Sequence, residues 1–202
     1  MGHSTGCQDV MEYLVGKGHE TRSPIDGGIL QAPVSDREAL VAAMDPKVYE
    51  EGCRIAQDMV DRGLGEDIMP SDAPKIFGAK PVCARRWLSL ASPNHDGDDD
   101  YFSSDLSDEQ LMKSFGSLPA KAPLCILFSG IDEHMPKTTD MAGLIQTWIG
   151  VVKRGNGKVD EENSGIVENA THNLVGNPEE VVADLVKRVL GFLTALPVQP
   201  SL

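Results

Sequence analysis

The sequence predicts an α/β fold in which helices cover both faces of a mostly parallel sheet. Short apolar runs typical of buried strands recur along the chain, and amphipathic helical patterns lie between and after them. A long stretch rich in proline and glycine separates the first apolar run from the second. A connection of that length predicts a cap inserted between two strands of the sheet.

Three apolar runs rich in β-branched or aromatic residues are the predicted strands. Each is bounded by polar or turn-forming residues, and the parallel sheet requires a crossover segment between successive runs. The runs cover residues 28–34, 124–128 and 165–168.

Four helices are predicted from apolar spacing and from their first residues. Residues 7–15 carry apolar side chains at helical spacing, and residues 46–60 follow Asp45 with a proline at the first helical position. Residues 106–115 begin with acidic side chains, which suit a helix N-terminus. The final helix starts around residues 177–180, and its expected buried stripe is Val182, Leu185, Val186, Val189, Leu190 and Leu193.

These elements divide the chain into three expected parts. Residues 1–36 hold the first helix and strand of the core, and residues 37–120 form the cap or lid. Residues 121–202 form the C-terminal part of the core, with two polar loops that follow strands. The cap is the natural place for substrate selection, because loops and insertions carry specificity on a rigid scaffold.

The composition excludes several classes of partner. The chain of 202 residues has 18 Lys and Arg against 31 Asp and Glu, which gives a formal net charge of −13. Nucleic-acid binders neutralise phosphates with clustered basic side chains, and anionic lipid surfaces attract the same kind of cluster. We therefore expect no nucleic-acid and no membrane partner, and no apolar run approaches the roughly 20 residues of a spanning helix.

The cysteines and the acidic run predict neither a metal site nor a cofactor. Four widely spaced cysteines form no C-x-x-C pair, so we expect buried thiols, and without a visible secretory signal a cytoplasmic setting. Residues 96–100 contain four aspartates, but Tyr101 stands where a calcium loop needs glycine. This run is a solvated acidic loop or an element of the cap.

The first residues match a motif that carries chemistry. Residues 2–6 read Gly-His-Ser-Thr-Gly, the G-x-S-x-G pattern of the nucleophile elbow, and an amphipathic helix follows at once. In an elbow, Ser4 stands clear of the sheet on a sharp turn, and glycine on either side relieves crowding. The backbone N–H of Thr5 would be one oxyanion donor, and the second donor is not found in this sequence. The alternative is a glycine-rich turn at a frayed terminus.

A serine nucleophile needs an acid and a histidine later in the chain. Asp132 lies just past the carboxyl end of the second predicted strand, the edge where α/β sheets build their sites. His172 follows the third strand and would take the proton of Ser4, whereas His134 lies too close along the chain to Asp132 to reach the serine easily. Asp36 is the rival acid, and the alternative for His172 is a surface or helix-capping histidine.

Three stretches of the chain are informative together: residues 2–9, residues 98–106 with the sequence Asp-Asp-Asp-Tyr-Phe-Ser-Ser-Asp-Leu, and residues 129–136. Together they resemble a known family, the fungal siderophore esterases, which are fusarinine C esterase-like α/β-hydrolases long known only as a domain of unknown function. The likeness continues through residues 86–90 and 170–174 and so covers nearly all of the chain. The segment around Tyr101 is its most specific part, because unrelated hydrolases share G-x-S-x-G.

The resemblance implies hydrolysis of ester bonds in hydroxamate siderophores such as triacetylfusarinine C, which releases iron inside the cell. Carried over by position, Ser4 is the nucleophile, Asp132 the orienting acid and His172 the base. A small-molecule ester is then the partner. Two alternatives stay open: a serine hydrolase of other acyl or lipid esters, and a hydrolase-like chain without turnover.

The position of the serine departs from the family pattern. An α/β-hydrolase normally forms its first strands and an oxyanion loop before the nucleophile, which here is residue 4. We therefore expect the C-terminal part of an α/β-hydrolase with its first strands missing, through a shortened reading frame or in a short protein completed from elsewhere. Because losing one oxyanion donor costs about 10²–10³ in rate, we expect this chain alone to be inactive or nearly so.

Overall fold

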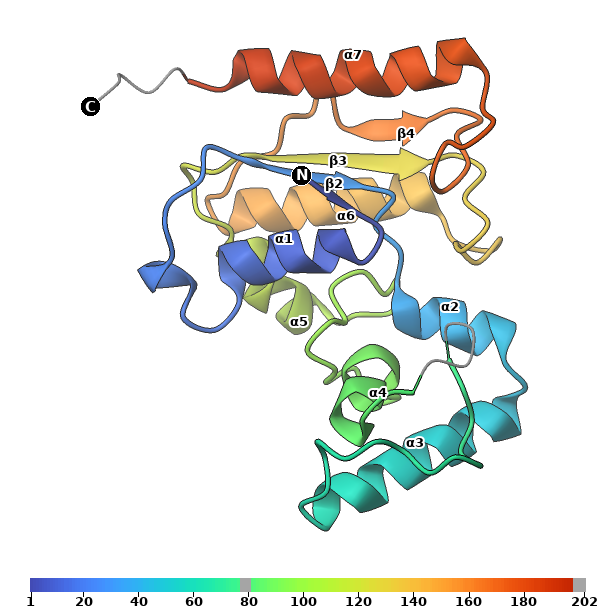
Figure 1. Ribbon diagram of the computed structural model, residues 1–202. Coiled ribbons are helices and arrows are strands. Elements are labelled where there is room, and N and C mark those ends of the chain that lie inside the picture. The colour runs from blue at the N-terminus through green and yellow to red at the C-terminus, as the bar shows by residue number, and fades with distance from the viewer. Residues whose placement is uncertain (77–80, 198–202) are drawn as a thin grey trace. The chain divides into compact units, whose positions relative to one another are not determined.

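The computed structural model describes residues 1–76 and 81–197 (Figure 1). The chain divides into two compact units, the first made of Met1–Val34 with Ser104–Leu202 and the second of Ser35–Ser103. The second unit is inserted in the chain between two strands of the first. Each unit has its own apolar core.

The first unit is built on a four-stranded parallel sheet in the order β1-β2-β3-β4. The three predicted strands are present, and the elbow itself adds a two-residue strand that the sequence did not indicate. Because all four strands are parallel, their carboxyl ends meet at one edge of the sheet. The strands are β1 (Gly2–His3), β2 (Gly28–Gln31), β3 (Leu124–Ser129) and β4 (Gly165–Val167).

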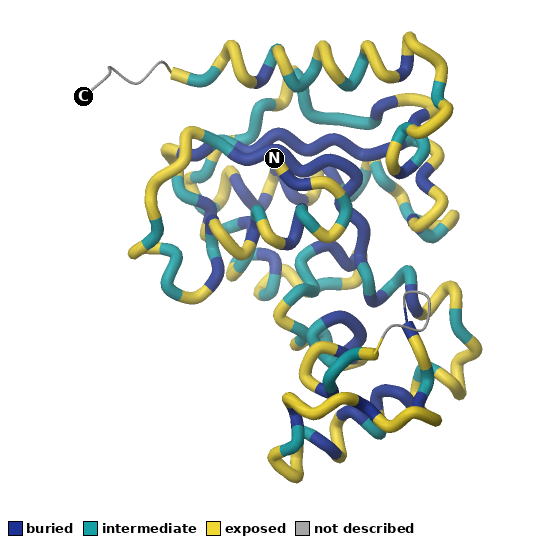
Figure 2. Tube along the Cα trace, viewed as in Figure 1, coloured by how far each residue is buried: buried dark blue, intermediate teal, exposed yellow. Residues whose placement is uncertain are grey.

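Helices cover both faces of this sheet, as the sequence predicts (Figure 1). On one face, Leu127 and its neighbours on β2 and β4 share a core with Phe192 of α7 (Glu179–Ala195). On the other face, Phe128 stacks on Trp148 of α6 (Met141–Arg154) with ring centroids 5.5 Å apart. Helix α1 (Gly6–Val15) lies on that second face, where its apolar side chains approach Gly28. Figure 2 shows that β2 and β3 are buried along their length.

The last helix forms where it is predicted, but it turns a different side to the core. Val181 and Phe192 are its buried side chains, with Leu185 and Val189 packed beside them. Four members of the expected stripe, namely Val182, Val186, Leu190 and Leu193, are 38–54% exposed. Apolar side chains of this helix point in most directions around its axis, so their spacing alone did not identify the buried side.

A short helical segment assigned to the cap by sequence belongs to the first unit. Helix α5 (Asp108–Lys113) starts with a capping box between Ser107 and Gln110, and the 3-10 helix η2 (Phe115–Ser117) follows it. Phe115 is fully buried and stacks on Trp148 with centroids 4.8 Å apart. The inserted unit of the structure ends at Ser103, and the extent of the cap over residues 37–120 stays a prediction.

The second unit is a small helical cluster around Trp87. Its helices are α2 (Asp36–Ala43), α3 (Pro46–Asp61) and α4 (Ala84–Ala91). Trp87 is fully buried against α3, where a Cβ on Gly52 would lie 2.1 Å from the indole. The predicted cap of α3 is confirmed, since the Asp45 carboxylate accepts the N–H of Lys47 at 2.9 Å.

The acidic run is tied into this unit rather than fully solvated. Asp100 forms an ion pair with Arg37 at 3.0 Å, and both side chains are buried, with 4% and 9% exposed. Asp99 pairs with Arg86. A buried carboxylate needs such partners, because an isolated charge loses its hydration. The run thus anchors the end of the inserted unit to its first helix.

Candidate active site

The serine of the G-x-S-x-G motif stands on a sharp turn between β1 and α1. Ser4 has a φ of +54°, a left-handed conformation that is strained for a residue with a side chain. Its N–H donates to the Gln31 carbonyl at 3.1 Å, and its own carbonyl accepts the N–H of Cys7 at 2.8 Å. A left-handed residue between a strand and a helix is the backbone geometry expected of a nucleophile elbow.

The two motif glycines differ in how closely other atoms surround them. A Cβ on Gly2 would lie 1.9 Å from the carbonyl oxygen of Gly6, so the turn leaves no room for a side chain there. A Cβ on Gly6 would meet nothing within 4 Å. The crowding expected on both sides of the serine is therefore found only at Gly2.

Two of the predicted site residues form a close pair at the same edge of the sheet. The Nδ1 atom of His172 lies 2.7 Å from the Oδ2 atom of Asp132, and their side chains are 9% and 1% exposed. The other carboxylate oxygen accepts the backbone N–H of His134 at 2.9 Å. A carboxylate accepts hydrogen bonds, so this contact favours the tautomer of His172 that carries its proton on Nδ1 and leaves Nε2 without one.

Two further histidines flank this pair, and sequence reasoning had given neither of them a role. The ring of His3, next to Ser4 in the chain, lies 4.9 Å from the ring of His172. The ring of His134 meets the ring of His172 edge-on, with centroids 4.6 Å apart. The contact with His3 places the His172 ring beside the elbow. His134, which lies two residues after Asp132 in the chain, thus contacts the proposed base His172.

Glu133 fixes the main chain of the histidine loop. Its carboxylate accepts the backbone N–H of His172 at 2.9 Å. This hydrogen bond lowers the pKa of Glu133, and its own backbone N–H adds to the effect. Glu133 therefore stays ionised near the histidine loop at neutral pH.

The remaining sequence candidates have distinct positions. Thr5 is the residue before α1, so its N–H belongs to the group of amides at a helix start that lack intrahelical acceptors. Asp36, the rival acid, is the first residue of α2 in the inserted unit, and the acid paired with His172 is Asp132.

The cysteines are free, and three of the four are buried. Burial raises the pKa of Cys7 and that of Cys125 to about 12, so both thiols stay protonated and unreactive at neutral pH. The thiol of Cys7 donates to the carbonyl oxygens of Gly2 at 3.4 Å and Gln31 at 3.2 Å. It thereby joins the start of α1 to the two neighbouring strands.

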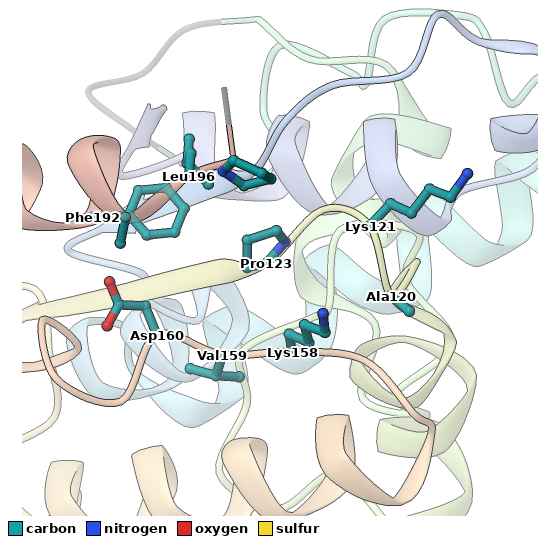
Figure 3. A pocket seen from close by; sticks show the side chains of 10 residues that line it. Ala120, Lys121, Pro123, Lys158, Val159, Asp160, Phe192 and Leu196 are labelled. Carbon is teal, nitrogen blue, oxygen red and sulfur yellow. The ribbon is translucent and has the colours of Figure 1, made fainter. Parts of the chain in front are cut away.

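A cavity of about 610 Å³ lies at the opposite edge of the sheet, where β3 begins (Figure 3). Pro123 and Lys158 line it together with Phe192 and Leu196 near the end of α7. Six residues of β3 separate it from the site, a distance of about 20 Å. This cavity is therefore remote from the Asp132–His172 pair.

Over residues 1–76 and 81–197, no group of three His, Cys, Asp or Glu side chains is arranged to hold a metal ion. Within the same ranges, no helix combines the length and apolarity needed to cross a bilayer.

Comparison with known proteins gives a consistent result. The chain is 37% identical to the fusarinine C esterase sidJ of Aspergillus fumigatus, over 97% of its own length and 66% of that protein. It superposes on the structure of the siderophore hydrolase EstB from Aspergillus fumigatus with a TM-score of 0.77 and 38% identity, covering 98% of this chain and 66% of that one. A carboxyl esterase from Bacillus coagulans has the same fold at 11% identity and a TM-score of 0.57, over 96% of this chain and 63% of that one.

The chain thus has the α/β-hydrolase fold of these esterases and spans about two thirds of the length of the relatives it matches. The family model described as "Protein of unknown function (DUF1749)" matches residues 1–194. The chain belongs to this family.

Proposed function

We propose that the chain carries the catalytic residues of a serine ester hydrolase that acts on hydroxamate siderophore esters. The observation that supports it most directly is the buried 2.7 Å hydrogen bond between His172 and Asp132, beside an elbow that holds Ser4 in a strained turn. The relatives named fusarinine C esterase and siderophore hydrolase support the choice of substrate class.

The residues would act in a sequence that balances protons. Ser4 Oγ attacks the ester carbonyl while Nε2 of His172 takes its proton, and Asp132 stabilises the imidazolium that results. The N–H of Thr5 donates to the oxyanion. The imidazolium then gives its proton to the leaving alcohol, which departs and leaves an acyl-enzyme. A water molecule attacks this ester with His172 again as base, and the carboxylic acid is released from Ser4.

The inserted unit, 35–103, is the proposed cap. It interrupts the core between β2 and β3 and has its own apolar centre around Trp87. An insertion of this kind suits substrate selection, because it can vary without disturbing the sheet. The four free thiols support a reducing, cytoplasmic setting for the reaction.

The proposed nucleophile is tested by covalent labelling, because a slow enzyme still forms a stable adduct. The pure chain is incubated with a fluorophosphonate and analysed by intact mass, beside the variants Ser4→Ala and Ser117→Ala. Ser117 lies on the surface and serves as the matched control. We expect one adduct in the wild type and in Ser117→Ala, and none in Ser4→Ala. No adduct on an intact Ser4 after prolonged incubation would refute an activated serine in this chain.

The substrate class is tested separately by mass spectrometry of the products. Because the chain alone is expected to be nearly inactive, it is incubated at high concentration and for a long time with triacetylfusarinine C and, for comparison, with short and long acyl esters of p-nitrophenol. Release of hydroxamate monomers that depends on Ser4 supports the siderophore proposal. Hydrolysis of the acyl esters alone would reassign the chain to the other class of ester.

A further inference from the structure

A buried amide lies between the elbow and the histidine loop. Gln31 is the last residue of β2 and is 5% exposed. The preceding residues of the strand are apolar, so Gln31 is a polar side chain at a buried and otherwise apolar position. Such a group is costly to bury unless each of its polar atoms finds a partner.

The side chain of Gln31 contacts three segments of the site. Its Oε1 pairs with Nδ1 of His3 in the elbow. Its Nε2 lies 3.3 Å from Oγ of Ser129, at the end of β3, and 3.5 Å from the backbone carbonyl of His172. Its main-chain carbonyl also accepts the N–H of Ser4 at 3.1 Å. One residue therefore joins the elbow, the central strand and the histidine loop.

The direction of these bonds follows from their chemistry. The carbonyl of His172 can only accept, so the amide nitrogen of Gln31 must face it. The amide oxygen then faces His3, whose Nδ1 must donate. The structure therefore predicts that neutral His3 carries its proton on Nδ1, while its ring rests 4.9 Å from the ring of His172.

We infer that Gln31 is a positioning residue for the proposed hydrolase site, an inference that rests on the proposed function. It acts through His3 and through the main chain of His172. Its two amide atoms hold the serine turn and the base at a fixed separation. Small displacements of reacting groups lower rates steeply, and a preorganised site depends on such supporting contacts.

Two variants separate the two ends of the amide. Gln31→Leu removes both hydrogen-bonding atoms at similar volume. Gln31→Glu keeps an acceptor for His3 but puts an oxygen opposite the carbonyl of His172, where two acceptors repel. The same two substitutions at Gln146, which is exposed on α6, are the matched controls.

The primary readout is ¹⁵N NMR of the histidine rings at about pH 8, which needs no turnover. The chain has five histidines, so single replacements assign their signals. We expect the Nδ1–H tautomer for His3 in the wild type and in Gln31→Glu, and its loss in Gln31→Leu. An Nε2–H tautomer for His3 in the wild type overturns the inference without any variant.

Labelling of Ser4 by the fluorophosphonate is the second readout. Loss of a net hydrogen bond or two predicts a rate about tenfold lower in both Gln31 variants and an unchanged rate in both Gln146 variants. If Ser4 labels normally in Gln31→Leu while the protein is folded, Gln31 does not position the site. If the wild type does not label at all, the proposed function fails in this chain, and the NMR result still decides the role of Gln31.

Discussion

Replacing Asp132 with asparagine should move the proton of His172 to the wrong nitrogen. In the wild type, one carboxylate oxygen accepts the backbone N–H of His134 at 2.9 Å, and the other pairs with His172 at 2.7 Å. Asparagine has one oxygen and one NH₂. If the NH₂ faced the N–H of His134, two buried donors would meet, at a cost of about 1–3 kcal/mol. The oxygen therefore stays with His134, the NH₂ faces Nδ1 of His172, and the ring proton moves to Nε2.

The expected loss follows from the charge as well as from the tautomer. A carboxylate and an imidazolium with charge centres about 4 Å apart attract by about 4 kcal/mol at an effective dielectric constant of 20. Solvent screens this pair little, because the side chains of Asp132 and His172 are 1% and 9% exposed. Losing that stabilisation in the transition state lowers the rate about 10³-fold, and the wrong tautomer adds to the loss.

Two measurements check this prediction. The rate of Ser4 labelling by a fluorophosphonate should fall at least about 10³-fold in Asp132→Asn, and ¹⁵N NMR should show the proton of His172 on Nε2. Asp72→Asn, an exposed carboxylate in the inserted unit, is the matched control and should change neither. Labelling within tenfold of the wild type, with the proton still on Nδ1, would refute the assignment of Asp132 as the orienting acid.

Other perturbations have clear expected outcomes. Gly2→Ala should lower the melting temperature sharply, because the new Cβ would lie 1.9 Å from the carbonyl oxygen of Gly6. Gly6→Ala should leave the stability unchanged or raise it by up to about 1 kcal/mol. Equal melting temperatures of the two variants would contradict the steric argument. The pKa of Glu133 is lowered in the folded chain. The ionised carboxylate therefore stabilises the fold at pH values above the pKa of the unfolded chain, which is about 4.3 for a glutamate. That stabilisation is lost as the pH falls through the folded pKa. The difference between the urea midpoints of the wild type and Glu133→Gln should therefore be largest near neutral pH and shrink as the pH falls towards the folded pKa of Glu133. A difference that stays constant with pH would show that Glu133 does not contribute to acid sensitivity. Iodoacetamide at about pH 8 should alkylate the native chain at Cys83 alone, since the other three thiols are buried; peptide mapping that finds a second modified cysteine would count against that burial.

The fold was predictable where local patterns and tertiary packing agree. The strand at 124–128 is a continuous apolar run, and the structure buries every residue of β3. Helix α6 was missed, because Met141–Arg154 combines two glycines with several β-branched residues and so lacks a clear helical signature. Its stability comes from Trp148, which stacks on Phe128 and Phe115 from elsewhere in the chain. Those contacts are not visible in a local window of sequence.

The candidate site was predictable as far as it depends on strand ends. Asp132 follows β3 and His172 follows β4, and parallel neighbouring strands bring their carboxyl ends together. Gln31 was counted only as a strand residue. A polar amide at the carboxyl end of a buried apolar strand was the available signal, but its partners lie 28, 98 and 141 residues away. No spacing rule relates positions that distant.

The geometry of the turn at Ser4 depends on β2 as much as on the strand that precedes the serine. The position of the serine at residue 4 predicts that the first strands of the fold are missing, yet Ser4 has a φ of +54° and Gly2–His3 pair with Leu30 and Gln31 of β2. Two hydrogen bonds join the turn to β2, because the N–H of Ser4 and the thiol of Cys7 both donate to the Gln31 carbonyl. These two bonds use the main-chain carbonyl of Gln31 and remain after a substitution there, whereas the side-chain amide contacts His3 and the carbonyl of His172. A change of the Gln31 side chain should therefore disturb the histidine beside the serine together with the base, whereas a change at Asp132 should disturb the base alone.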